Sequence, residues 1–145
     1  MRFMVFALLL VGACGNPPRE RFYTLDAPEP PVAADGAPSI AVGPVSVPEL
    51  VDRPQLVVRL GANQVALEEQ ARWAEPLRGA IARVVAANLA TALGARVVPR
   101  NGERRSGRSV AREKPQRKEH DALVAAHSAA LAAISRDIAA AIRKP

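Results

Sequence analysis

Few side chains in this 145-residue sequence are of the types that carry out chemistry, and their spacing does not favour catalysis. The two histidines, His120 and His127, lie seven residues apart and lack the i, i+4 spacing of a helical zinc pair. Ser46, Asp52 and His127 include the residue types of a hydrolase triad, but no G-x-S-x-G motif accompanies them. The sequence contains neither a Walker A loop nor a G-x-G-x-x-G motif. We therefore expect a protein that is not an enzyme and holds no metal ion or cofactor.

The single cysteine, Cys14, has the most specific chemistry in the chain. One cysteine excludes an intramolecular disulfide and any cysteine-rich metal site. Three roles remain: a buried apolar residue, a reactive thiol, or a lipidated residue. A buried role is disfavoured because prolines follow Cys14 and the segment offers no core. A reactive thiol is disfavoured because only Arg19 and Arg21 are near enough in the sequence to lower its pKa. The residues 11–14, VGAC, instead fit a lipobox, in which the sulfur is alkylated with diacylglycerol before cleavage between Ala13 and Cys14.

The segment before Cys14 has the layout of a bacterial signal peptide, with Arg2, an apolar run over 3–11 and two small residues. The run is too short to span a bilayer, which takes ~20 apolar residues. We therefore predict that residues 1–13 are removed, and that Cys14 carries diacylglycerol and an N-linked acyl chain such as palmitate. Two or more acyl chains give stable anchoring. The residue after Cys14 is Gly15 and not the aspartate associated with inner-membrane retention, and this favours the outer membrane.

Residues 14–38 are predicted to form the lipidated N-terminus and a proline-rich tether. Proline fixes φ and lacks a backbone donor, so helix and central strand are both disfavoured here. Within this stretch Phe22, Tyr23 and Leu25 form an apolar island that predicts one edge strand. The six prolines of the stretch are Pro17, Pro18, Pro28, Pro30, Pro31 and Pro38.

Residues 39–143 are predicted to form one small domain. Alternating apolar residues predict a strand over 39–47, and the segments 55–60 and 64–67 predict a hairpin around the turn GAN at 61–63. A short strand is expected over 95–98.

Two segments with helical periodicity complete this domain. Leu77, Ile81, Val84, Val85, Leu89 and Leu93 share one face of a helix over 76–93, which Gly94 would cap. Leu123, His127, Leu131, Ile134, Ile138 and Ile142 form the stripe of a second helix over 121–143, with Asp121 as its N-cap. The elements predict a small two-layer α/β domain, in which a mixed or antiparallel, incomplete sheet packs against these two helices.

The net charge of +6 is concentrated between the two predicted helices. Residues 100–119 contain eight Lys or Arg and three Glu, so they contribute 8 − 3 = +5, and the rest contributes 12 − 11 = +1. Residues 99–120 hold one large aliphatic residue, Val110, and are predicted to be disordered. The segment is either a solvated linker or a weak contact for anionic lipid. Export makes nucleic acid a poor match for it.

Apart from the lipobox, several motifs of the sequence resemble those of a known family, the ABC-type transport auxiliary lipoproteins. This family is also called PqiC-like and is associated with MCE transport systems. The resemblance is carried by the motif V-x-V-P-x-x-x-x-R-P-Q at 45–55, by N-Q-V at 63–65 and by W-A-E-P-L at 73–77. The closing segment DALVAAHSAALAAISRDIAAAI is also similar to the last helix of the family. One departure is clear: family members carry further strands between the two helices, where this chain has the basic segment. An internal deletion would explain that difference.

The resemblance implies a periplasmic domain on an outer-membrane lipid anchor that docks onto an MCE protein, working with an ABC permease and ATPase to move lipids between two membranes. It implies no catalytic residues. Four residues of the matching motifs are candidates for the docking surface: Arg53, Gln55, Asn63 and Trp73. Trp73 either fills the core beside the helix start or forms a surface recognition spot. The alternative function is a structural or assembly lipoprotein of an outer-membrane complex without a role in lipid transport.

Overall fold

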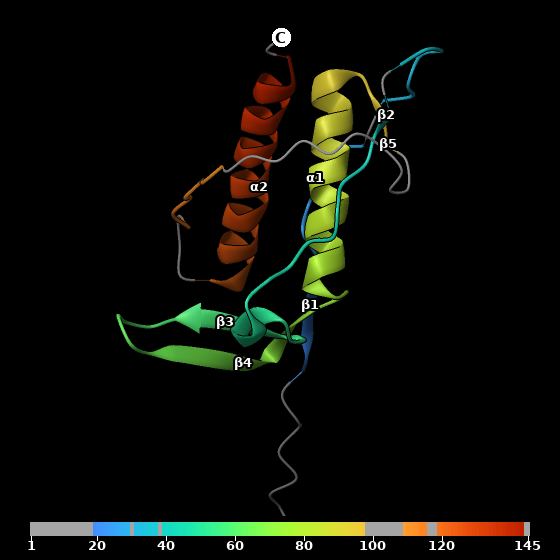
Figure 1. Cartoon of the computed structure of the whole chain (residues 1–145). Helices are drawn as coiled ribbons and strands as arrows, with labels where there is room; N and C mark the ends of the chain where they lie inside the picture. Colours follow the sequence, from blue (N-terminus) through green and yellow to red (C-terminus); the bar gives the residue numbers. More distant parts are fainter. Residues whose placement is uncertain (1–18, 30, 38, 98–108, 116–118, 144–145) are drawn as a thin grey trace, which may run out of the picture.

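The computed structural model describes residues 19–29, 31–37, 39–97, 109–115 and 119–143. The predicted signal peptide, Cys14 and most of the basic segment lie outside these residues. The described chain forms a small α/β domain with an incomplete, open sheet of three strands and two helices, as the sequence predicts. The helices stand side by side, and the sheet lies across one end of the pair (Figure 1).

The three-stranded sheet has the order β1-β4-β3 and mixes both strand directions. The strands β3 (Gln55–Arg59) and β4 (Val65–Trp73) form the predicted antiparallel hairpin. Its turn is closed by the Leu60 N–H, which donates to the Gln64 carbonyl at 2.9 Å. β4 continues six residues beyond the predicted end at Leu67, because its last residues pair with β1.

The strand β1 (Arg21–Tyr23) runs parallel to the end of β4 and forms one edge of the sheet. The edge strand predicted around Phe22 is thus present. Leu25, just beyond it, is 2% exposed and belongs to the main core. The packed body therefore includes residues that the sequence assigned to the tether, because one leucine of that stretch finds a place between the sheet and the helices.

The strand predicted over 39–47 is wrong for most of its length. Only β2 (Ser39–Ile40) is a strand, and it pairs in parallel with β5 (Arg96–Val97). Residues 41–48 have no regular structure, although Val42, Val45 and Val47 are half-buried in alternation with exposed neighbours. The alternation correctly indicated which side chains face the protein, but it could not supply a partner strand beyond residue 40.

The helix α1 (Leu77–Leu93) confirms the first predicted helix. The carbonyl of Pro76 accepts the first helical hydrogen bond, from the Ala80 N–H at 3.1 Å. Gly94 ends the helix with φ of 60°, a left-handed conformation that glycine adopts without steric cost.

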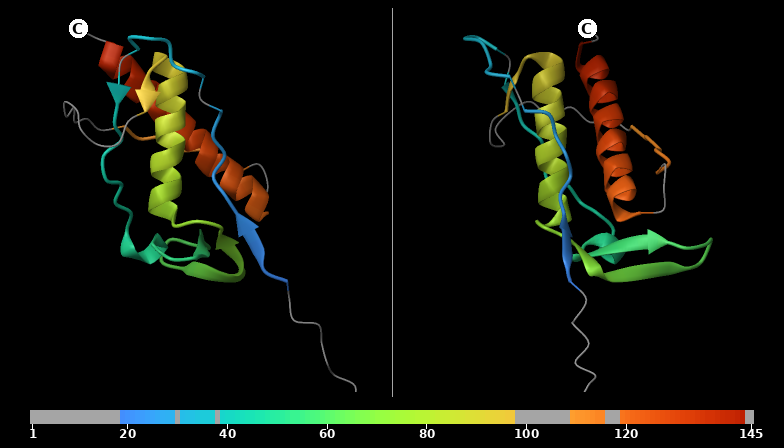
Figure 2. Two further views of the ribbon diagram at one scale, coloured as in Figure 1. Left: turned by 90° about the vertical axis from the view of Figure 1, so that its right-hand side faces the viewer. Right: turned by 180° about the vertical axis from the view of Figure 1, so that it is seen from behind.

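The helix α2 (His120–Arg143) begins one residue before the predicted start, so Asp121 lies in the first turn and is not the N-cap. A negative charge is still favourable there because of the helix dipole. Arg143 at the other end donates to the Ala92 carbonyl near the end of α1. Figure 2 shows α2 crossing α1 at an angle rather than running alongside it in register.

The stripe predicted for α2 does not coincide with its buried side. The side chains that are buried are Val124, Ser135 and Ala139, and the Ser135 hydroxyl donates to the Leu131 carbonyl at 2.8 Å. Small side chains at this crossing let the two helices approach closely, since the interaxial distance depends on the residues in contact. The large residues Leu123 and Leu131 are half-buried.

Two clusters of buried residues form the core. The first joins the sheet to both helices and includes Leu25, Leu56, Ala71, Ala80, Val84 and Val124. The second lies between the helices and the segment after β2, around Val85, Leu89 and Ala139. By length and composition alone, α2 is the one helix among the described residues that could cross a membrane. Its contribution to both clusters leads us to interpret it as a packed helix of the domain.

Candidate functional site

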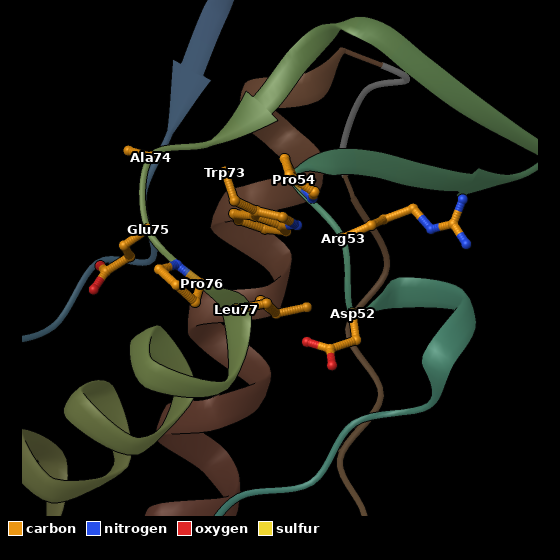
Figure 3. A pocket seen from close by; sticks show the side chains of 8 residues that line it. All are labelled: Asp52, Arg53, Pro54, Trp73, Ala74, Glu75, Pro76 and Leu77. Carbon is orange, nitrogen blue, oxygen red and sulfur yellow. The ribbon is translucent and has the colours of Figure 1, made fainter.

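The surface has a notch of about 320 Å³ between the end of β4 and the segment before β3. Trp73 lies on its floor, with Pro54, Pro76 and Leu77 around the indole (Figure 3). The two prolines are placed by their neighbours, because the Trp73 N–H donates to the Pro54 carbonyl at 2.7 Å and Pro76 opens α1. The side chains around the indole are therefore mainly apolar.

The two acidic residues at the notch form ion pairs with arginines of α1. Asp52 Oδ2 lies 3.0 Å from Arg78 Nη2, and Glu75 Oε1 lies 2.6 Å from Arg83 Nη2. In Figure 3 the Glu75 side chain points away from the hollow, whereas the Asp52 carboxylate stands at its rim. Arg53 contributes its backbone and stem, and its guanidinium points away from Trp73. A ligand would thus meet the indole and prolines first.

Of the four docking candidates, the structure brings three to one region. Arg53 and Trp73 line the notch, and Gln55 begins β3 directly beside them, opposite Arg72. Asn63 is exposed in the hairpin turn and is not part of this site. The sequence missed Asp52, Pro54, Pro76 and Leu77 as lining residues. A signal was available for three of them, since Pro54, Pro76 and Leu77 are themselves residues of the matching motifs.

Trp73 also closes a second cavity of about 240 Å³ on the inner side of the sheet. Its walls are apolar and come from the sheet and both helices, with His127 as the polar exception. His127 meets Trp73 edge-on, with ring centroids 6.3 Å apart and an interplanar angle of 80°. Trp73 is therefore both a wall of the core and the floor of the notch, so the two roles proposed for it from the sequence are compatible.

A polar network fixes the strand ends behind the notch. Arg83 Nη2 donates to Glu75 Oε1, to Thr24 Oγ1 at 3.2 Å and to the Leu25 carbonyl at 3.1 Å. Thr24 Oγ1 in turn donates to Glu75 at 3.1 Å, and the Ala74 N–H donates to the Tyr23 carbonyl at 2.8 Å. These contacts join the segment after β1 to the connection between β4 and α1.

The Glu75 carboxylate makes this network pH-dependent. The Arg83 hydrogen bond, helped by Thr24, holds the pKa of Glu75 below its ordinary value of 4.5. A lowered pKa in the folded state means that the contribution is present above the unfolded value and is lost as pH falls through the folded value. The side chains are about half exposed, so solvent keeps the effect small.

We therefore expect the free energy of unfolding to fall as the pH is lowered from neutral to below 4.5. Part of that slope should disappear in Glu75→Gln, which cannot ionise. Urea unfolding at a series of pH values, followed by circular dichroism, measures the slope. The matched control is Glu29→Gln, an exposed glutamate in the described chain. An identical pH slope in Glu75→Gln and Glu29→Gln would contradict the expectation.

The described residues contain no group of three or more His, Cys, Asp or Glu placed to hold a metal ion. The two residues of the predicted cleavage site, Ala13 and Cys14, lie outside the described residues. In the basic segment, residues 109–115 have no regular structure, and Ser109 Oγ donates to Asp137 at 2.8 Å. The prediction of disorder over the remainder of 99–120 falls mostly on residues that the structure does not describe.

Comparison with known proteins adds a sequence match and two structural matches. Residues 23–112 match the family model described as an ABC-type transport auxiliary lipoprotein component. A crystal structure of an uncharacterized protein superposes with a TM-score of 0.67 at 18% identity, covering 86% of this chain and 99% of that one. A protein from Xanthomonas campestris, described by the family model DUF330, gives 0.53 at 15% identity, with 82% and 92% covered. No curated protein matches the chain in sequence. The structural matches concern the fold alone.

Proposed function

The chain belongs to the family of ABC-type transport auxiliary lipoprotein components, and from this premise we propose that it is the outer-membrane-anchored subunit of an MCE-type lipid transport system. In this proposal it is anchored through lipidated Cys14, faces the periplasm and docks onto the MCE protein. The family match over more than half of the chain is the observation that carries the proposal. The protein acts by tethering and docking and catalyses no reaction.

The notch around Trp73 supports a docking role at a defined place. Aromatic residues and arginine are enriched where protein interfaces bind most strongly. Trp73 is half-buried at the floor, and Pro54 and Pro76 stand exposed beside it. Arg53 lines the same notch with its backbone and stem, while its guanidinium points away from Trp73.

Co-purification of the native lipoprotein from membranes tests the proposal. Recovery of an MCE protein together with its permease and ATPase supports it. Recovery of a β-barrel or a secretion ring instead would favour the alternative, a structural or assembly lipoprotein without a role in lipid transport. The two outcomes are distinguished by mass spectrometry of the captured proteins.

At the level of residues, Arg53→Glu should weaken capture of the partner by about tenfold, since reversing a charge at an interface costs on the order of 1.4 kcal/mol or more. Arg53 is half-buried beside the notch, so circular dichroism must show that the variant keeps the fold. Arg136→Glu is the matched control, because Arg136 is an exposed arginine on α2, away from the notch. Equal loss in both variants would show that overall charge matters and the notch does not.

A further inference from the structure

We infer that the face of the three-stranded sheet turned away from the helices is a membrane-contact surface, lying against the lipid headgroups of the bilayer that holds Cys14. The inference rests on the proposed lipid anchor, and it adds a second surface to the protein that is distinct from the notch. Its support comes from the strand register, the exposed apolar side chains, the charges around them and the short distance along the chain to Cys14.

The register of the strands assigns side chains to the two faces, because paired residues on neighbouring strands point to the same side. One face meets the helices: Tyr23 lies 5.9 Å from the His120 ring, Glu68 is 3.2 Å from His120, and Trp73 meets His127. The partners in register place a different set on the opposite face. That set, here called the outer face, comprises Phe22, Gln55, Arg59, Val65, Leu67 and Arg72.

Several large apolar side chains on or beside the outer face are exposed to solvent. Phe22 is 62% exposed, Leu67 41% and Val65 37%. Leu60, at the end of the hairpin beside this face, is 59% exposed. Val65, Leu67 and Leu60 lie together at the hairpin end of the sheet, and Phe22 lies on β1 near the other end of β4. Exposed apolar residues that gather on one part of a small protein mark an interaction site. Aromatic and aliphatic side chains with neighbouring arginines are also the composition of protein surfaces that lie in a lipid interface.

The charges around the outer face favour a negatively charged partner surface. Arg19 and Arg59 are exposed, and neither takes part in an ion pair within the described residues. Arg72 is matched by Glu20, whose Oε1 lies 3.1 Å from Arg72 Nη2. With Glu69, the three arginines and two glutamates give 3 − 2 = +1. Anionic lipid headgroups attract arginines in this position.

The chain length before the sheet brings this face close to the anchor. Arg21, the first residue of β1, follows Cys14 by 21 − 14 = 7 residues. At no more than ~3.6 Å per residue, the chain allows about 25 Å between them. β1 begins at the sheet end of the molecule, opposite the end of α2 (Figures 1 and 2). A body held by so short a link therefore presents its sheet end, and with it the outer face, to the membrane.

The test uses the full lipoprotein reconstituted in vesicles of phosphatidylethanolamine and phosphatidylglycerol. Leu67→Cys places a label on the outer face, and Ala129→Cys places the same label on an exposed position of α2. Because lipidation consumes the Cys14 sulfur, each variant carries a single free thiol for an environment-sensitive dye. With a headgroup-bound quencher in the vesicles, the dye on residue 67 should be quenched several-fold more than the dye on residue 129. Adding Arg59→Glu should reduce that difference.

Each other outcome overturns the inference in a recognisable way. Equal quenching at both positions, with one labelled thiol per chain, refutes the membrane contact and leaves the anchor intact. Two labelled thiols per chain show that Cys14 is unmodified, so the anchor fails and the contact falls with it. Protection of residue 67 only after addition of the captured partner protein would assign the outer face to that protein instead of lipid. Thermal unfolding of both labelled variants controls for loss of the fold.

Discussion

Replacing Leu25 by alanine is expected to lower the free energy of unfolding by about 2–5 kcal/mol, the range for truncating a buried leucine. Leu25 is 2% exposed and packs in the cluster that joins the sheet to both helices. A small domain has ~5–15 kcal/mol of total stability, so the loss would be a large part of it. Chemical unfolding followed by circular dichroism and by the fluorescence of Trp73 measures the change.

The matched control for Leu25→Ala is Val32→Ala, which also truncates an aliphatic residue of the proline-rich stretch. Val32 is 100% exposed, so its replacement should change stability by no more than about 0.5 kcal/mol. If both variants unfolded at the same denaturant concentration as the parent, the segment after β1 would be a free tether and not part of the body.

Replacing Cys14 by alanine is expected to abolish lipidation altogether. The proposed chemistry requires the sulfur as nucleophile for the diacylglycerol, and cleavage follows that modification. The variant should therefore incorporate no labelled palmitate and accumulate as a precursor that retains residues 1–13. Labelling in growing cells and the mass of the purified protein measure these two effects.

Gly15→Ala is the control for the cysteine variant, because it alters the neighbouring residue and keeps the thiol. It should be labelled and processed like the parent. Unchanged labelling of Cys14→Ala would refute the lipobox interpretation, and membrane attachment would then need another explanation. A loss of labelling in both variants would point to a general failure of export.

The helices were predictable from the sequence because the signals that define them are local. The apolar spacing of α1, the proline before it and Gly94 after it all act within a few residues, and the structure confirms each of them. The bounds of α2 were also found to within one residue. The hairpin turn and the edge strand at Phe22 follow from equally local patterns.

The remainder depends on contacts between distant segments, which a single sequence does not encode in its periodicity. The apolar alternation over 39–47 could not show that only β5 is available to pair, for two residues. In the alanine-rich α2, several faces are apolar enough to pack, so the position of the crossing decides which one is buried. That crossing selects Val124, Ser135 and Ala139 rather than the larger residues of the predicted stripe.

Only part of the candidate site could be predicted from the sequence, because the site also depends on contacts between distant segments. Trp73, the single tryptophan of the sequence, and Arg53 stood out because they belong to motifs that resemble the family. The notch itself requires Pro54, before β3, and Pro76 and Leu77, at the start of α1, to meet around the indole at the end of β4. From the sequence, the histidines were considered as a metal pair, and His127 also as a triad residue and a member of the helical stripe, whereas the structure places both against aromatic rings of the sheet.

The parallel pairing of β1 with β4 sets the order in which the chain can fold. Tyr23 lies beside Trp73, so 73 − 23 = 50 residues separate two neighbours in the sheet. The hairpin and α1 rely on nearby contacts and can form early, whereas closing a long loop is slow. We therefore expect β1, the first strand in the chain, to be the last strand of this sheet to pair.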